Sequence, residues 1–214
     1  MNVMAINGSP RKTWNTAMML EKALEGARSK GAGTELIHLY DLVYRGCISC
    51  FACKAKGGEH YGACAMKDDL TSILKKAAEA DAVILGSPIY FGNMTGEMRS
   101  FLERFLFQYL VYANPPRSLF PKKMKIGLIY TMNAPEAVMK DIGYDKFFAT
   151  NEMIAKLLFG SSETICSYET LQFEDYSKVV FEMFDPSVRV TRRRDVFPQD
   201  LQKAFDMGVR FASA

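Results

Sequence analysis

Residues 2–16 read NVMAINGSPRKTWNT, an apolar strand pattern that runs into a short turn and then into the start of a helix. The turn, residues 8–10, is Gly-Ser-Pro, and apolar side chains recur at helical spacing from Ala17 to Ala27. A strand that stops at such a turn and opens a helix presents free backbone N–H groups and the positive end of the helix dipole. Because anions bind at that position, the stretch predicts a phosphate site at the carboxyl end of the first strand.

The turn carries neither of two common phosphate motifs. It lacks the Gly-x-Gly-x-x-Gly of dinucleotide sites and the Gly-x-x-x-x-Gly-Lys-Ser/Thr of nucleoside triphosphate sites. With one glycine available, side-chain donors must surround the anion, which suits a single terminal phosphate better than a bridging pyrophosphate. The alternative is an ordinary turn in which a Ser or Thr caps the helix. Arg11 and the donors beside it are more than such a cap requires. The candidate donors around the anion are Ser9, Thr13, Asn15 and Thr16, together with the cation of Arg11.

The composition is that of an ordinary globular protein. The chain has 214 residues, of which 49% are hydrophobic and 24% charged, enough for one substantial core. The net charge of +3 argues neither for nor against a nucleic-acid partner, and we expect none. No apolar stretch reaches membrane-spanning length, and the first residues form a strand pattern rather than a signal peptide. We therefore expect a cytoplasmic protein without a membrane partner.

Apolar segments alternate with helical patterns along the chain. The predicted strands are Val3–Ile6, Glu35–Leu39, Ala82–Leu85, Ile126–Tyr130 and Thr164–Tyr168. Beyond the first helix, helices are predicted behind Asp68, with an apolar face from Leu70 to Ala77, and over Thr95–Tyr112, Tyr144–Leu158 and Pro198–Phe211. Unbroken apolar strands separated by helices predict an α/β fold, a doubly wound five-stranded parallel sheet with helices on both faces. Ligands of such sheets bind at the carboxyl ends of the strands.

The loops after the third and fourth strands are therefore candidate parts of the same site. Residues 86–96 read GSPIYFGNMTG, in which two later glycines allow close backbone approach to a flat ligand and two aromatic rings can lie against it. A turn with buried aromatic side chains is the alternative for this loop taken alone. After the fourth strand, Thr131-Met132-Asn133 offers small polar groups at the same edge.

These motifs in combination resemble the flavodoxin-like NADPH-dependent FMN reductases, and most closely the iron–sulfur flavoproteins. The resemblance covers about residues 1–135. It rests on Gly8–Arg11 with Asn15-Thr16, Asp68-Asp69, Ala80-Asp81, Gly86–Gly92 and Phe101–Arg104. It implies a single flavodoxin-like FMN-binding domain over residues 1–214, whose part after about residue 135 is less recognisable.

The resemblance also implies which residues hold the cofactor. The FMN phosphate would be bound by the first loop, here by Ser9, Arg11, Asn15 and Thr16, and NAD(P)H would be the co-substrate. The isoalloxazine edge would be held by the loop after the third strand, here Pro88, Ile89, Tyr90, Phe91 and Gly92, with Thr131 at the neighbouring strand end.

Four of the five cysteines fall in one insert, residues 46–66. Cys47, Cys50 and Cys53 are spaced by two residues each, and Cys64 follows after ten more. Three thiols at that spacing can bind one side of a four-iron cluster, with a fourth ligand from farther along the chain. Zinc is an alternative, although structural zinc sites usually pair two close doublets. Thiols without metal are the third interpretation. The last gap is longer than in the iron–sulfur flavoproteins.

Other signals are weaker. His38 lies in a strand pattern and is expected to be structural, whereas His60 lies in the cysteine insert as a surface group or a spare ligand. Residues 192–194 are three arginines, either a solvated face or an attractor for the 2′-phosphate of NADPH. Cys166 is expected to be a small buried hydrophobic group. The apolar run 101–112 predicts burial in a homodimer interface or beneath the C-terminal part, and relatives often form homodimers or homotetramers.

The sequence thus predicts an FMN-dependent oxidoreductase that passes electrons from NAD(P)H or another reduced donor to a small acceptor. A quinone, a flavin, a nitro compound or an iron–sulfur partner would be the acceptor. Two alternatives stay open. One is a non-catalytic electron carrier that serves a redox partner protein, and the other is a sensor in which the cysteines respond to redox state or metal. Catalytic side chains stay unassigned.

Overall fold

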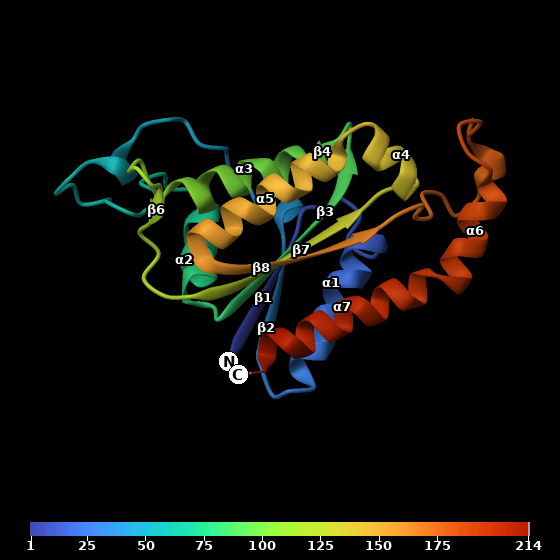
Figure 1. The fold of residues 1–214 in the computed structure, drawn as a ribbon, viewed down its shortest axis with the longest axis horizontal. Coiled ribbons are helices and arrows are strands. Elements are labelled where there is room, and N and C mark those ends of the chain that lie inside the picture. Colours follow the sequence, from blue (N-terminus) through green and yellow to red (C-terminus); the bar gives the residue numbers. More distant parts are fainter. Residues whose placement is uncertain (214) are drawn as a thin grey trace.

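The computed structural model describes residues 1–213 and shows a twisted parallel sheet between two layers of helices (Figure 1). The strand order is β2-β1-β3-β7-β8, and every pair along this path is parallel. The strands are β1 (Asn2–Asn7), β2 (Gly33–His38), β3 (Ala82–Tyr90), β7 (Met124–Thr131) and β8 (Gly160–Ser167). A two-residue strand, β4 (Asn93–Met94), pairs antiparallel with the end of β3. The predicted five-stranded doubly wound sheet is confirmed, with β4 as a short addition.

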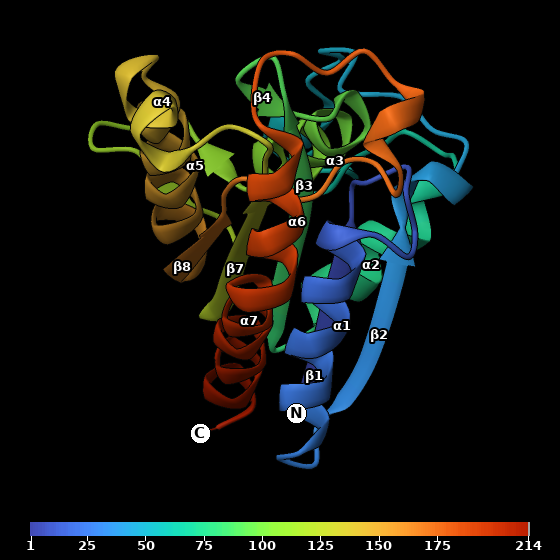
Figure 2. The ribbon, with the colours of Figure 1, turned by 90° about the vertical axis from the view of Figure 1, so that its right-hand side faces the viewer.

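Helices cover both faces of the sheet. They are α1 (Asn15–Arg28), α2 (Leu70–Glu79), α3 (Gly96–Phe107), α4 (Glu136–Asp141), α5 (Tyr144–Phe159), α6 (Pro186–Asp195) and α7 (Phe197–Ala212). α1 and α7 pack on one face, and α2, α3 and α5 pack on the other (Figures 1 and 2). Short 3₁₀ turns cover Leu39–Asp41, Ala52–Lys54 and Tyr176–Lys178. None of the described helices is long and apolar enough to cross a membrane.

Three predicted boundaries are wrong. The third strand was predicted to end at Leu85, but β3 continues to Tyr90, so residues 86–90 belong to the strand rather than to the loop after it. The helix predicted over Thr95–Tyr112 ends at Phe107, and residues 110–111 form strand β5, paired with β6 at residues 117–118. The apolar pattern does not mark the helix end, because Tyr109 and Leu110, beyond the helix, still pack against the core. The fifth strand begins at Gly160 rather than at Thr164. Its first residues are polar and partly exposed at the sheet edge, so they carry no apolar signal.

Two aromatic side chains of α3, Phe101 and Phe105, are buried within the chain itself. Phe105 stacks on Phe159 at the end of α5, with ring centroids 5.1 Å apart, and Tyr109 and Phe120 close the cluster. Of the two expectations for this apolar run, packing beneath the C-terminal part therefore accounts for the buried rings.

α1 and α7 approach each other so closely that glycine is required on both. A Cβ atom at Gly208 would lie 1.7 Å from the carbonyl oxygen of Ala23, and one at Gly26 would lie 2.0 Å from that of Phe205. Backbone oxygens cannot rotate away from such a contact. The two glycines therefore set the distance between these helices, and with it the place of the C-terminal helix on the sheet.

Candidate functional site

A small cavity lies at the carboxyl ends of the central strands, where ligands of such sheets bind. Its volume is about 70 Å³, which suits a phosphate group rather than a whole flavin. The end of β3 and the loops after β1, β7 and β8 line it. Of the ten predicted cofactor residues, eight are among its lining: Ser9, Arg11, Asn15, Thr16, Pro88, Ile89, Tyr90 and Thr131. The remaining lining residues are Trp14, Met132, Asn133, Thr170, Leu171 and Gln172.

The first loop is held in shape by its own side chains. Asn7 is fully buried, and its Oδ1 accepts a hydrogen bond from the backbone N–H of Ser9 at 2.9 Å. The Asn7 Nδ2 lies 2.9 Å from Nδ1 of His38, which confirms the structural role expected for that histidine. The Ser9 Oγ accepts from the backbone N–H of Arg11 at 3.1 Å. The loop is therefore organised before any ligand arrives.

The start of α1 presents donors and a cation to the cavity. Helix geometry leaves the first backbone N–H groups of α1 without intrahelical partners, and its first turn holds no acidic residue to compete for them. The Arg11 guanidinium stacks on Trp14, 3.9 Å from the ring centroid, and donates to the carbonyl oxygen of Gln172 at 2.6 Å. An exposed cation beside free helix donors is the arrangement that binds a phosphate.

The Asn15 amide is engaged within the protein. Its Nδ2 donates to the carbonyl oxygen of Leu171 at 2.8 Å, and its Oδ1 accepts from Arg193 at 2.8 Å. Thr16 is buried, and its hydroxyl lies 2.7 Å from that of Thr131 across the sheet edge. These two predicted phosphate ligands thus also join α1 to β7 and to the C-terminal segment.

The loop after β3 lies against the first loop. Thr95 caps α3, and its Oγ1 donates to the carbonyl oxygen of Gly8 at 2.7 Å. Tyr90 lines the cavity and is 44% exposed at its outer edge. Phe91 and Gly92, both at positive φ, form the two-residue turn between β3 and β4 and lie outside the cavity lining. Phe91 is fully exposed at the tip of this turn.

The segment after β8 was missed by the sequence analysis. Residues 170–172 cover the first loop, with two of their carbonyl oxygens accepting hydrogen bonds from Arg11, Trp14 and Asn15. Only the position of this segment in the chain indicates that it belongs to the site. This segment follows the fifth predicted strand, and the carboxyl ends of parallel strands meet at one edge.

The four cysteines of the insert surround one small apolar pocket. Cys53 is buried, Cys47 and Cys64 are half-buried, and Cys50 is exposed. Among residues 1–213, no three His, Cys, Asp or Glu side chains lie close enough together to hold a single metal ion. A four-iron cluster asks for a different arrangement, because each thiolate binds its own iron around a shared space. The four thiols are the donor set that such a cluster takes.

Cations lie beside these thiols. Burial raises the pKa of Cys53, the nearby Lys54 ammonium lowers it, and the other three insert thiols raise it further. Arg104 lines the pocket, is 2% exposed, and has a buried Nε without a partner in the described chain. An unpartnered buried N–H beside four sulfurs is a donor that a thiolate-bound group would satisfy.

The last turns of α3 hold both ends of the cysteine insert. Glu103 Oε2 accepts from the backbone N–H of Cys47 at 3.1 Å, and Gln108 Oε1 accepts from that of Cys64 at 2.9 Å. Arg104 pairs with Asp68 at 2.6 Å and donates to the carbonyl oxygens of Arg45 and Met66. One helix end therefore positions the four thiols.

The three arginines at 192–194 have three different surroundings. Arg192 pairs with the buried Asp200 at 2.6 Å, Arg193 binds Asn15 and stacks on Phe197, and Arg194 is exposed beside Asp195. The interpretation as one solvated face is therefore wrong for the first two. Cys166 is half-buried rather than buried as predicted, and its side chain packs against the main core. Burial raises the pKa of this thiol to about 11, so it stays neutral.

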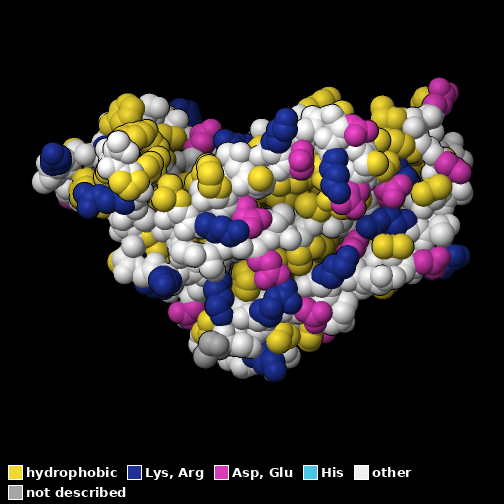
Figure 3. Space-filling model, in the orientation of Figure 1, with side chains coloured by type: hydrophobic (Ala, Val, Ile, Leu, Met, Phe, Trp, Pro, Cys, Tyr) yellow, Lys and Arg dark blue, Asp and Glu magenta, His cyan; other side chains and the backbone are white. Residues whose placement is uncertain are grey.

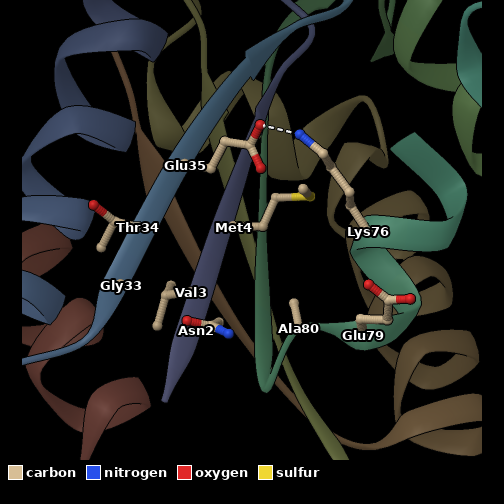
Figure 4. A pocket seen from close by; sticks show the side chains of 9 residues that line it. All are labelled: Asn2, Val3, Met4, Gly33, Thr34, Glu35, Lys76, Glu79 and Ala80. Carbon is tan, nitrogen blue, oxygen red and sulfur yellow. Dashed lines mark hydrogen bonds and ion pairs between the residues drawn. The ribbon is translucent and has the colours of Figure 1, made fainter. Parts of the chain in front are cut away.

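A larger cavity lies at the opposite end of the strands and is not a candidate for the same chemistry. It occupies about 300 Å³ beside the first residues of β1 and β2 (Figure 4). Its two facing charges, Lys76 and Glu35, neutralise each other at 2.6 Å. The carboxyl ends of the strands, where the first loop and Arg11 lie, are therefore the better site.

Comparisons with known proteins identify the family. The family model of NADPH-dependent FMN reductases matches residues 1–131. An iron–sulfur flavoprotein of Methanocaldococcus jannaschii is 37% identical over 127 residues, 59% of this chain and 59% of the relative, so less than two-thirds of that protein is matched. A second one from that organism is 29% identical over 194 residues, 90% of this chain and 92% of the relative. The solved NAD(P)H:quinone oxidoreductase of Methanothermobacter marburgensis shares the fold, with a TM-score of 0.70, 15% identity and 98% of each chain covered.

Proposed function

Because the chain belongs to the NADPH-dependent FMN reductase family, we propose that it is an FMN-dependent oxidoreductase that passes electrons from NAD(P)H to a small acceptor. The observation that carries the proposal is the meeting of four chain segments at one sheet edge, with Arg11 and the free donors of α1 beside Ile89 and Tyr90 at the end of β3. A quinone, a nitro compound or free flavin is the proposed acceptor.

The overall reaction with a quinone balances without a catalytic side chain. NAD(P)H gives up a hydride, solvent supplies one proton, and the quinone takes up two electrons and two protons. FMN, when bound, supplies the hydride and electron transfer chemistry. The protein's part is to bind the phosphate at Ser9, Arg11, Asn15 and Thr16 and to orient the ring beside Pro88–Gly92. Phe91, a bulky residue at positive φ, is kept in a strained and exposed position that a role at the ring edge would explain.

Replacing Arg11 by alanine should weaken FMN binding by about 10- to 100-fold, the value of one charge-assisted hydrogen bond. Riboflavin, which has the same ring but no phosphate, should bind the variant as well as it binds the wild-type protein. Flavin fluorescence titrations with both compounds measure the two dissociation constants.

The matched control is Lys12→Ala, which removes the same charge from the neighbouring residue. Lys12 pairs with Asp41 and does not line the cavity. Its removal should leave FMN binding within about twofold, because an exposed ion pair contributes little. Equal losses of FMN and riboflavin in Arg11→Ala would show that Arg11 does not recognise the phosphate.

We further propose that Cys47, Cys50, Cys53 and Cys64 bind a four-iron cluster. Their shared apolar pocket and the free Nε of Arg104 support this assignment. Protein purified without oxygen should contain about four irons and acid-labile sulfide and should show a broad absorbance beneath the flavin bands. Zinc in place of iron, or thiols that titrate as free without metal, would contradict it.

A non-catalytic carrier that serves a redox partner protein is the second candidate. Figure 3 shows hydrophobic side chains gathered over the projecting cysteine insert and the β5–β6 hairpin. Exposed among them are Ile48, Phe51 and Tyr112. Such a patch can face a partner protein or another copy in a homodimer or homotetramer. Rapid oxidation of NAD(P)H by the pure protein with a quinone would exclude a carrier that has no turnover of its own.

A further inference from the structure

The buried Arg189 of α6 makes a set of contacts that the proposed chemistry does not use. Its guanidinium is 2% exposed and lies over Phe184, 4.5 Å from the ring centroid. Nε donates to Oδ1 of Asn133 at 2.6 Å, and Nη2 donates to the backbone oxygen of Asn133 at 3.0 Å. Nη1 pairs with Glu169 at 2.9 Å. Burying a cation is costly unless it is paired, so this arrangement is specific to its partners.

Arg189 fixes which end of the Asn133 amide faces the cavity. A guanidinium has donors only, so the Asn133 oxygen must be the atom that points toward it. The amide nitrogen, with two N–H donors, is the end that remains. Asn133 lines the cavity, and no described residue accepts a hydrogen bond from its Nδ2. The site therefore holds a donor whose orientation is set from behind.

The position of Asn133 indicates which part of a ligand it meets. The phosphate donors belong to the loop after β1 and to α1, whereas Asn133 follows β7. β7 is the neighbour of β3, and Ile89 and Tyr90 are the last two residues of β3. We propose that Asn133 Nδ2 donates a hydrogen bond to an acceptor atom of the flavin ring, and that Arg189 is the positioning residue that holds this donor in place. The inference rests on the proposed FMN site.

Asn133→Asp is the decisive variant because it separates binding from folding. The carboxylate keeps the shape of the amide and keeps acceptors for Arg189, so the thermal midpoint should stay unchanged or rise. The cavity loses its donor and gains a negative charge. FMN and riboflavin should therefore both bind at least about tenfold more weakly, and the midpoint potential of the bound flavin should become more negative. This differs from Arg11→Ala, which affects FMN alone.

A double-mutant cycle tests whether Arg189 acts through Asn133. Arg189→Lys keeps the charge but loses the planar set of donors, and it should reduce flavin affinity less than Asn133→Asp does. Combined with Asn133→Ala, it should cause no further loss, because the donor that it positions is already gone. Additive losses would show that Arg189 serves the fold in general.

The outcomes are distinguishable from those of the proposed function. A wild-type protein that binds neither FMN nor riboflavin would overturn the FMN site itself. A wild-type protein that binds both, together with an Asn133→Asp variant of equal affinity and potential, would overturn only the role of Asn133. Loss of FMN binding with riboflavin binding retained would place Asn133 at the phosphate instead and would also contradict the inference.

Discussion

Gly208→Ala should lower the free energy of unfolding by about 3 kcal/mol or more. Two opposing effects decide whether the substitution stabilises or destabilises the protein. Alanine favours a helix over glycine by about 1 kcal/mol. Against this, the new Cβ would lie 1.7 Å from the backbone oxygen of Ala23, and an overpacked core loses about 1–3 kcal/mol even where side chains can move aside. Here the obstacle is the backbone of α1, so the loss should exceed the gain. Urea unfolding followed by circular dichroism measures the difference.

The control for this prediction is Gly96→Ala at the first residue of α3. A Cβ at Gly96 meets no atom within 4 Å, and the backbone there does not need glycine. The protein should be as stable as wild type or slightly more stable. If Gly208→Ala also proved neutral, the two helices would have to slide apart without cost, and their contact would not determine the place of α7.

Arg104→Met should destabilise the protein by about 3–5 kcal/mol, the usual result of removing one partner from a buried ion pair. The Arg104 side chain is fully buried, and Asp68, 17% exposed, would lose its partner. The carbonyl oxygens of Arg45 and Met66 would each lose a donor. Because these two residues flank the cysteine insert, limited proteolysis within residues 46–66 should become faster as well.

Two companion variants separate the causes. Arg104→Met combined with Asp68→Asn removes the uncompensated charge and should recover part of the stability. Arg99→Met, at a half-buried arginine of the same helix, should cost far less than Arg104→Met. A double variant no more stable than Arg104→Met would show that the lost carbonyl contacts, rather than the unpaired carboxylate, dominate.

The parts of the fold that could be predicted are those with a local signal. The central strands β1, β3 and β7 each contain an apolar run, and the turn at Gly8-Ser9-Pro10 marks both the end of β1 and the start of α1. The second half of β3 was not predicted because Gly86-Ser87-Pro88 interrupts its apolar run. The predicted start of the edge strand β8, at Thr164, lies after its true start at Gly160, because its first residues are polar and partly exposed. Helix α6 was not predicted, although Asp185 before Pro186 is a recognisable helix start.

The parts of the candidate site that could be predicted are likewise those with a local sequence signal. The first loop could be identified because its side chains carry the chemistry. The contribution of residues 170–172 could not, since they act through backbone carbonyl oxygens, which every residue has. The role of Arg189 was hidden for a different reason. It depends on α6 folding back over the end of β7, which is a long-range contact that no local pattern records.

The contacts between the end of α3 and the cysteine insert allow the length of that insert to vary. Lys54 binds the carbonyl oxygens of Phe107 and Leu110, and Cys64 is held by Gln108. The backbone N–H of Gly62 also donates to the carbonyl oxygen of Cys53 at 3.0 Å. Residues 54–61 therefore form a loop whose two ends are held together. Doubling the length of a loop with fixed ends costs only about 0.6 kcal/mol in loop-closure entropy. The number of residues between the third and fourth cysteines can thus drift during evolution while the thiols keep their positions.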